Sequence, residues 1–218
     1  MPREREELLR ESGFTDKEKI IVLAFEGNDT EEIYFEDLKS AELYNNDLIY
    51  LHILKRPKSD TNSAPKHVFN KLKREAKDEY NFKESDELWM IIDTDRWKNI
   101  DEIVSECKKQ QNMYVAVSNP CFEFWLLLHI KEITEYSKDE LELILKNNKV
   151  SKNSRPFVEK KIVEILGSYN KSNPKTEIFL KNIEKAIIQA RNLNHNNEEY
   201  PTKLGSFVYK LIEKLTNQ

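Results

Sequence analysis

The sequence predicts an α/β fold in which a parallel sheet of about four strands is flanked by helices, followed by a C-terminal helical extension. Two observations predict the sheet: four short apolar runs suited to buried strands, and a helix-length segment after each of them. Repeated alternation of strand and helix implies right-handed crossovers and therefore parallel strands. Strand-like runs end near residue 130, and the remaining patterns indicate helices.

The four expected strands share an apolar run bounded by charged or polar residues. The run at 88–92 reads Leu-Trp-Met-Ile-Ile, which is typical of a strand buried on both faces of a parallel sheet. The strands are expected at residues 19–25, 47–54, 88–92 and 113–117.

Helices are expected where apolar residues recur at helical spacing. Thr30 or Asp29 can cap the first helix, and Pro65 stands at the start of the second. The segment 121–130 is apolar almost all round, so we expect a buried helix there. The expected helices are 31–43, 65–80, 100–110, 121–130, 138–146, 156–166, 177–193 and 203–215.

These patterns divide the chain into a polar tail at 1–16, an α/β domain at 17–130 and a helical part at 131–218 packed on that domain. The composition, 39% hydrophobic and 34% charged, contains no apolar run of bilayer length, so we expect no membrane contact. The first twelve residues are rich in Arg and Glu, unlike a signal peptide. The two cysteines lack the spacing of a zinc site or a disulfide framework, and a cytoplasmic location is expected.

The glycine and charge content narrow the possible functions. With four glycines and no Gly-rich phosphate loop or dinucleotide fingerprint, the sequence disfavours P-loop NTPases and Rossmann dehydrogenases. Because the net charge is −4, any nucleic-acid contact depends on local basic patches. The best such patch is 146–161, with Lys149, Lys152 and Arg155 as expected contacts, although basic runs are commonly just solvated surface.

Acidic residues directly follow two of the expected strands. Glu26 follows the first strand, and Asp93 and Asp95 follow the third. The carboxyl ends of parallel strands share one edge, where open α/β sheets bind ligands, so the three acids can face one site. Mg²⁺ or Mn²⁺ would relieve their mutual repulsion, orient a phosphodiester and activate water. The alternatives are that Thr94 or Asp95 caps the next helix, or that the acids are simply solvated.

Further residues are expected around these acids. Glu26 is also placed to act as a general acid or base, and Gly27 follows it directly. Glu31 is expected either to support the metal ligands from behind or to interact favourably with the dipole at the start of its helix. Glu123 is the only acid in its apolar helix and needs a cation, either Arg96 or a lysine, unless it is a fourth acid of the site. Arg96 can also contact a phosphate.

Four segments of the chain match motifs that occur together in one known family. Residues 26–35 read Glu-Gly-x-x-Thr-Glu-x-x-Tyr-Phe, residues 93–95 read Asp-Thr-Asp, and residues 118–129 contain Ser-Asn-Pro-Cys-Phe-Glu-Phe-Trp and Leu-Leu-His. In this order they resemble the motifs of RloB-like proteins. Residues 200–202 are a weaker match to that family's closing Asn-Pro-x-Thr segment, because Tyr200 stands in place of Asn.

This resemblance implies a Toprim-like fold, since a Glu after the first strand and an Asp-x-Asp after the third form the Toprim pattern of topoisomerases, primases and OLD-type nucleases. It further implies a Mg²⁺-dependent nuclease of bacterial anti-phage defence, often encoded beside an AAA-type ATPase partner.

Two other functions remain compatible with the residues. One is a non-catalytic binding module that works with the ATPase partner. The other is a phosphatase of the haloacid dehalogenase type with Asp93 as nucleophile, although in that class the motif follows the first strand, and here a strand ending at Glu26 precedes it. The sequence leaves open whether a nucleic-acid substrate is DNA or RNA, and whether the chain forms a homo-oligomer.

Overall fold

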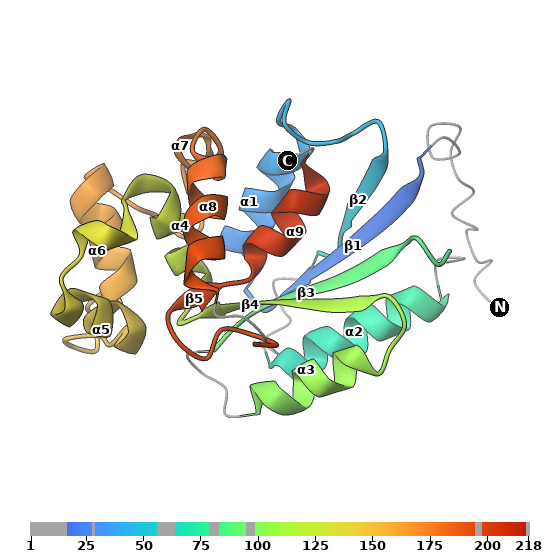
Figure 1. Cartoon of the computed structure of the whole chain (residues 1–218), viewed down its shortest axis with the longest axis horizontal. Helices are drawn as coiled ribbons and strands as arrows, with labels where there is room; N and C mark the ends of the chain where they lie inside the picture. Colours follow the sequence, from blue (N-terminus) through green and yellow to red (C-terminus); the bar gives the residue numbers. More distant parts are fainter. Residues whose placement is uncertain are drawn as a thin grey trace.

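A five-stranded sheet in the order β2-β1-β3-β4-β5 forms the centre of the computed structural model of this chain (Figure 1). Its first four members run parallel, and β5 is antiparallel to β4. The strands are β1 (Lys19–Phe25), β2 (Ile49–Ile53), β3 (Glu87–Asp93), β4 (Met113–Asn119) and β5 (Gly205–Ser206). The structure describes residues 17–27, 29–55, 64–78, 83–94, 99–194 and 198–216.

The inner strands are buried on both faces because each face carries its own hydrophobic core. Along β1, Ile21, Leu23 and Phe25 point into one core, whereas Val22 and Ala24 point into the other. This alternation follows from the two-residue period of a strand. It explains why β1 and β3 read as continuous apolar runs rather than as alternating ones.

Helices cover both faces of the sheet. α2 (Pro65–Asp78) and α3 (Ile100–Lys108) lie on one face, and α1 (Thr30–Lys39) and α9 (Val208–Leu215) lie on the other (Figure 1). The architecture confirms the predicted α/β fold with a mostly parallel sheet flanked by helices, and it is consistent with the Toprim-like description.

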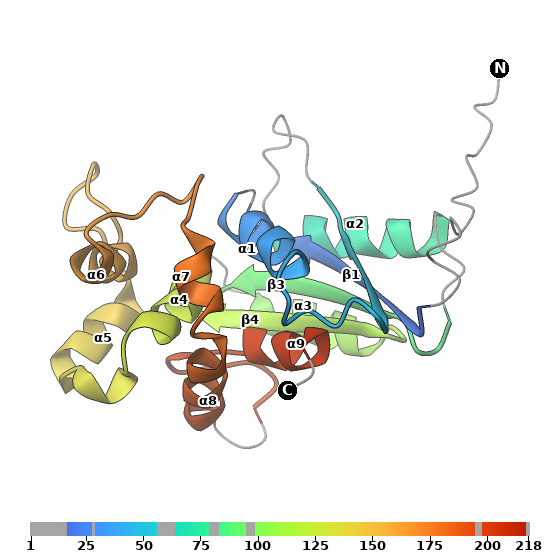
Figure 2. The same cartoon turned by 90° about the horizontal axis from the view of Figure 1, so that it is seen from above.

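A group of helices lies beyond the carboxyl ends of the parallel strands (Figures 1 and 2). Its centre is α4 (Phe122–Ile130), which contacts α6, α7 and α8. Residues 122–129 are all buried, which confirms the predicted burial of this helix. The others are η1 (Ile133–Glu135), α5 (Lys138–Lys146), α6 (Phe157–Leu166), α7 (Thr176–Leu180) and α8 (Ile183–Leu193).

Two predicted helices are wrong in part. The helix expected at 203–215 begins only at Val208, because Gly205 and Ser206 extend the sheet by pairing with Asn119 and Ser118. The helix expected at 177–193 is interrupted near Asn182, whose side-chain amide donates to the Ile178 carbonyl at 2.8 Å and competes with helix continuation. The remaining bounds differ from prediction by a few residues, and the predicted tail at 1–16 lies outside the described part of the chain.

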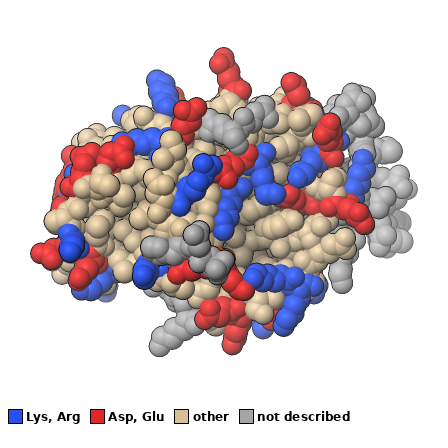
Figure 3. All heavy atoms as spheres, in the orientation of Figure 1, with Lys and Arg blue, Asp and Glu red and all other residues tan. Residues whose placement is uncertain are grey.

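The surface mixes both signs of charge. On the face in view, Lys and Arg side chains are interspersed with Asp and Glu (Figure 3). Within the described residues, no helix has both the length and the apolar character needed to cross a bilayer.

The outer edge of β2 is covered by Tyr44. Its buried hydroxyl donates to the Ile49 carbonyl at 2.7 Å and accepts the Leu51 N–H at 2.9 Å. The Ile49 carbonyl and the Leu51 N–H lie on the outer edge of β2, which is the edge strand of the sheet and pairs with β1 on its inner edge. Tyr44 therefore satisfies groups that would otherwise be an open template for another strand.

We expect Tyr44→Phe to lower the free energy of unfolding by about 1–3 kcal/mol, because it leaves a buried donor and a buried acceptor without their partner. Urea denaturation followed by circular dichroism measures this change. Tyr114→Phe is the matched control: Tyr114 is 39% exposed on β4, and its change is expected to stay within about 0.5 kcal/mol. Equal stability of the two variants would contradict the edge role of Tyr44.

Candidate functional site

Glu26 and Asp93 meet at the carboxyl edge of the sheet. The register of β1 and β3 pairs Phe25 with Ile91, and the Glu26 N–H donates to the Ile91 carbonyl at 3.0 Å. The Glu26 side chain then turns toward the tip of β3, where its Oε2 accepts the Asp93 N–H at 3.1 Å. Glu26 is only 7% exposed. The strand order thus brings together two acids that are far apart in the sequence.

The tip of β3 is also fixed to β4 on its other side. The Thr94 N–H donates to the Ser118 carbonyl at 3.0 Å, and the Thr94 hydroxyl donates to Asn119 Oδ1 at 2.9 Å. Asn119 in turn donates to the Pro201 carbonyl at 3.1 Å. The alternative that Thr94 caps the next helix is wrong, since its hydroxyl binds Asn119 and α3 begins at Ile100. Asp95 and Arg96 lie outside the described residues.

Glu31 joins Glu26 from the first turn of α1. Its carboxylate lies against Gly27, where an added Cβ would come within 2.3 Å of both Glu31 carboxylate oxygens. Gly27 thus leaves the space that the carboxylate occupies. Burial, and next the negative charge of Glu123, raise the pKa of Glu31 to about 7, and Glu26 contributes in the same direction. Glu31 is therefore largely protonated below neutral pH.

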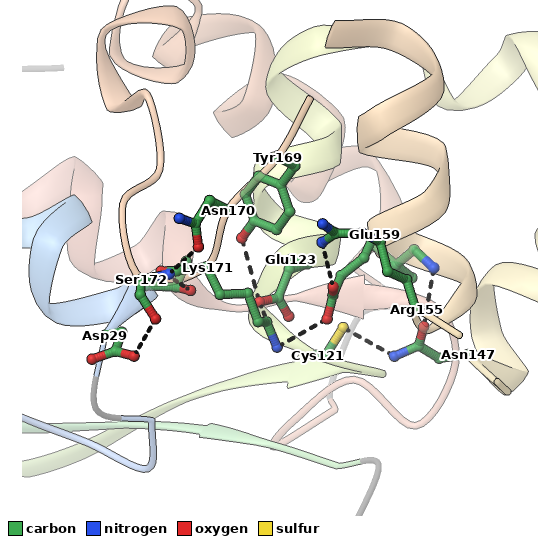
Figure 4. A network of polar contacts seen from close by, with 12 residues as sticks. Asp29, Cys121, Glu123, Asn147, Arg155, Glu159, Tyr169, Asn170, Lys171 and Ser172 are labelled. Atoms are coloured by element: carbon green, nitrogen blue, oxygen red, sulfur yellow. Dashed lines mark hydrogen bonds and ion pairs between the residues drawn. The ribbon is translucent and has the colours of Figure 1, made fainter. Parts of the chain in front are cut away.

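Glu123 is paired with a lysine (Figure 4). This carboxylate is buried, and its Oε1 lies 2.9 Å from Lys171 Nζ and accepts the Tyr169 hydroxyl at 3.4 Å. The same Nζ is 3.3 Å from Glu159 Oε1, and Arg155 reaches Glu159 Oε2 at 3.4 Å. Burial alone would lower the pKa of Lys171, but the charge of Glu123 and Glu159 raises it above its ordinary value. The sequence predicted that Glu123 pairs with a cation, either Arg96 or a lysine, and in the structure that cation is Lys171.

Lys171 belongs to the strap, defined here as residues 167–175 between α6 and α7. The strap is fixed to the start of α1, because the Thr30 hydroxyl donates to the Lys171 carbonyl at 3.0 Å and Ser172 donates to Asp29 at 2.8 Å. Sequence reasoning missed the strap, which reads as a polar Asn-rich link. The only signal for it was the requirement of Glu123 for a cation.

A family model for RloB-like proteins matches residues 21–215. The chain belongs to the RloB-like family. The match covers all the motifs noted in the sequence and confirms the resemblance drawn from them. A search of the curated proteins and a search of the solved structures found no match.

The RloB-like motifs converge in space. The first motif supplies Glu26 and Glu31, the second supplies Asp93, and the third supplies Glu123. Glu26 and Asp93 lie at the carboxyl edge. Beside it is the acid network, defined here as Glu31, Glu123, Glu159 and Lys171. Of the predicted basic contacts, Lys149 and Lys152 are exposed between α5 and α6. Arg155 is exposed as well and is tied to the network through Glu159.

The described residues contain no group of three or more His, Cys, Asp or Glu side chains arranged to hold a metal ion. Glu26 and Asp93 are two carboxylates of the kind that Mg²⁺ and Mn²⁺ prefer as ligands. The third predicted ligand, Asp95, is outside this part of the chain. The donor chemistry therefore fits a hard divalent cation at the Glu26–Asp93 contact.

The raised pKa of Glu31 predicts a pH-dependent stability in EDTA. The carboxyl holds its proton up to about pH 7 in the folded state but only to about 4.5 when unfolded. Its stabilising effect is therefore complete below pH 4.5 and is lost as the pH rises through 7. Glu31→Gln, which mimics the protonated form, should gain stability over wild type progressively between pH 5 and 8.

Urea denaturation at several pH values measures this difference. Glu32→Gln is the control, because Glu32 lies beside Glu31 on the more exposed side of α1, 3.9 Å from Lys55. Its difference from wild type should not change over the same range. A pH-independent difference for Glu31→Gln would show that Glu31 is ionised in the folded protein.

Proposed function

We propose that this RloB-like protein is a Toprim-type nuclease that hydrolyses phosphodiester bonds of DNA or RNA with Mg²⁺ or Mn²⁺ as cofactor. The observation that carries the proposal is the contact between Glu26 and Asp93 at the carboxyl ends of adjacent strands. This edge is where open α/β sheets bind ligands. The acids at this edge come from motifs that RloB-like proteins share.

Glu26 and Asp93, with Asp95 as the expected third ligand, would hold the metal. The bound ion would polarise the phosphate and activate a water molecule. Glu26 is also proposed to take or return a proton at that water, because its carboxylate lies at the same strand edge as Asp93. Glu31, protonated below about pH 7, adds no full negative charge beside Glu26 under those conditions.

The biological setting is proposed on the family resemblance. We infer a role as an anti-phage defence effector that works with an AAA-type ATPase partner in the cytoplasm. Cys107 and Cys121 are buried and form no disulfide, as suits a reducing compartment. Lys149, Lys152 and Arg155 form an exposed basic segment suited to the phosphate backbone of a nucleic acid.

One observation favours a second candidate, a non-catalytic binding module acting with the ATPase. The described residues include no group of three or more side chains arranged to hold a metal ion, and the Glu26 carboxylate already accepts the backbone N–H of Asp93. The phosphatase alternative has less support, since Glu26 follows β1, the first described strand, and Asp93 stands at the end of β3.

The proposal is tested by incubating the protein with tRNA, single-stranded DNA and duplex DNA in Mg²⁺ or Mn²⁺, alone and with its ATPase partner. Glu26→Gln and Asp93→Asn should each lower the cleavage rate by at least about 100-fold, the loss typical when a group that stabilises the transition state is removed. Gel electrophoresis of the products measures the rate.

Glu36→Gln serves as the matched control, because Glu36 lies on α1 and pairs with Lys55 at 3.2 Å, outside the acid network. It should cleave like wild type. Wild-type rates in both Glu26→Gln and Asp93→Asn would remove the nuclease proposal. Absence of cleavage together with no Mg²⁺ or Mn²⁺ uptake in calorimetry would favour the binding module.

A further inference from the structure

The outer edge of β4 carries backbone groups that point away from the rest of the sheet. On the inner side, backbone N–H groups donate to the Asn112 carbonyl at 2.8 Å and to the Ser118 carbonyl at 3.0 Å, so β4 bonds to β3 through its even-numbered residues. The backbone groups of successive residues point to opposite sides of a strand. Those of Met113, Val115 and Val117 therefore point outward.

β5 covers only the carboxyl end of this outer edge (Figure 1). It pairs with residues 118–119, and the Phe207 N–H that follows it donates to the Val117 carbonyl at 2.9 Å. Among the described residues, none forms a hydrogen bond with the outward backbone groups of Met113 and Val115. The edge of β4 is thus unpaired along the first part of the strand.

This part of β4 has none of the features with which proteins usually protect an edge strand. At the opposite edge of the sheet, Tyr44 satisfies the outward groups of β2. Residues 110–122, by contrast, contain no charged side chain, and residues 113–117 read Met-Tyr-Val-Ala-Val. Unpaired backbone groups on an uncharged strand of this kind are a template for pairing with another strand.

We propose that the first part of β4 pairs antiparallel with the same segment of a second copy of this chain, which joins the two sheets into one. A two-fold axis at Tyr114 places each Met113 opposite Val115 of the second copy. Both residues direct their backbone groups outward, so each such pair exchanges both of its N–H···O=C hydrogen bonds.

The length of the open segment favours a second copy as the partner. The two-fold arrangement uses residues 113–115 of each chain and leaves β5 paired with residues 118–119. A long strand from another protein would instead run into β5. The absence of charge between residues 110 and 122 also lets two copies meet without repulsion between like charges.

The side chains at the proposed axis suit this pairing. Tyr114 is 39% exposed, and its ring stacks on Trp89 with the ring centroids 5.0 Å apart. Lys214 Nζ lies 5.4 Å from the centroid of the Tyr114 ring. In the pair of strands, Tyr114 lies directly opposite Tyr114 of the second copy, and aromatic pairs across antiparallel strands are stabilising.

The pairing leaves the candidate catalytic edge free. Asp93 is in register with Ser118, at the other end of β4 from Met113. Because the two β4 strands run in opposite directions, the Glu26–Asp93 contacts of the two copies lie toward opposite ends of the joined sheet. The sheet pairing therefore holds whether or not these acids cleave nucleic acid.

Sedimentation equilibrium of the full-length protein over a range of concentrations tests the proposal. The mass should rise from that of one chain, 25.9 kDa, toward twice that value. Val115→Pro removes the outward N–H without removing a bond to β3, which is a position where an edge strand tolerates proline. Because it deletes a hydrogen bond from each of the two symmetric contacts, it should raise the dimer Kd at least about tenfold.

Val150→Pro is the matched control, because Val150 is 81% exposed between α5 and α6. This variant should dimerise like wild type. A mass of one chain at every concentration would overturn the proposal and leave the edge of β4 to a strand of another protein. A dimer that Val115→Pro does not weaken would overturn it as well, because the contact would then lie elsewhere.

Tyr114→Cys locates the contact directly. Residues directly opposite each other in a non-hydrogen-bonded antiparallel pair have Cα atoms about 4.5 Å apart, which is within the range of a disulfide. Oxidation with diamide should give a covalent dimer on a non-reducing gel that dithiothreitol reverses. Ser105→Cys, exposed on α3, should remain a single chain, and Cys107 and Cys121 are buried. Failure of Tyr114→Cys to cross-link would overturn the two-fold pairing.

Discussion

The hydrogen-bond register between β1 and β3 is the constraint on which the candidate site depends. It sets the Glu26 carboxylate beside the Asp93 backbone, and a shift by one residue would turn every side chain of β1 to the opposite face. The register is strongly specified because β1 contributes side chains to two hydrophobic cores, one on each face of the sheet. Leu23 packs in one core and Val22 packs in the other. Packing on both faces of the sheet therefore fixes the relative position of two acids that have no other reason to meet.

The second determinant is the cost of burying charge around α4. Glu123 lies inside an apolar helix, and a buried carboxylate without a partner is strongly destabilising. Lys171 supplies its partner from the strap and also reaches Glu159 on α6. One cation thus joins α4, α6 and the strap, and the strap in turn binds the start of α1. The helices beyond the sheet are consequently held against the edge that carries Glu26 and Asp93.

The sequence predicted those features that depend on local pattern. Apolar runs located four strands, and the position of acids after two of them predicted the meeting of Glu26 and Asp93, because strand ends share an edge. The strand at Gly205 and Ser206 could not be predicted, since two residues carry no periodicity and pair only through β4. The pairing of Lys171 with Glu123 could not be predicted either. The partners of Lys171 come from elements distant in the sequence, and its surroundings have the composition of an ordinary polar loop.

The late position of α9 has a consequence for how the protein is made. Val208, Leu211 and Leu215 fill the same core as Ile21 and Phe35, and residues 44–45 bond to the backbone of 215–216. A ribosome synthesises this helix after all the other helices and strands described, so a nascent chain presents one half-covered side of its sheet until translation reaches that point. Shortening the chain before residue 208 would leave that apolar surface uncovered permanently, which favours aggregation.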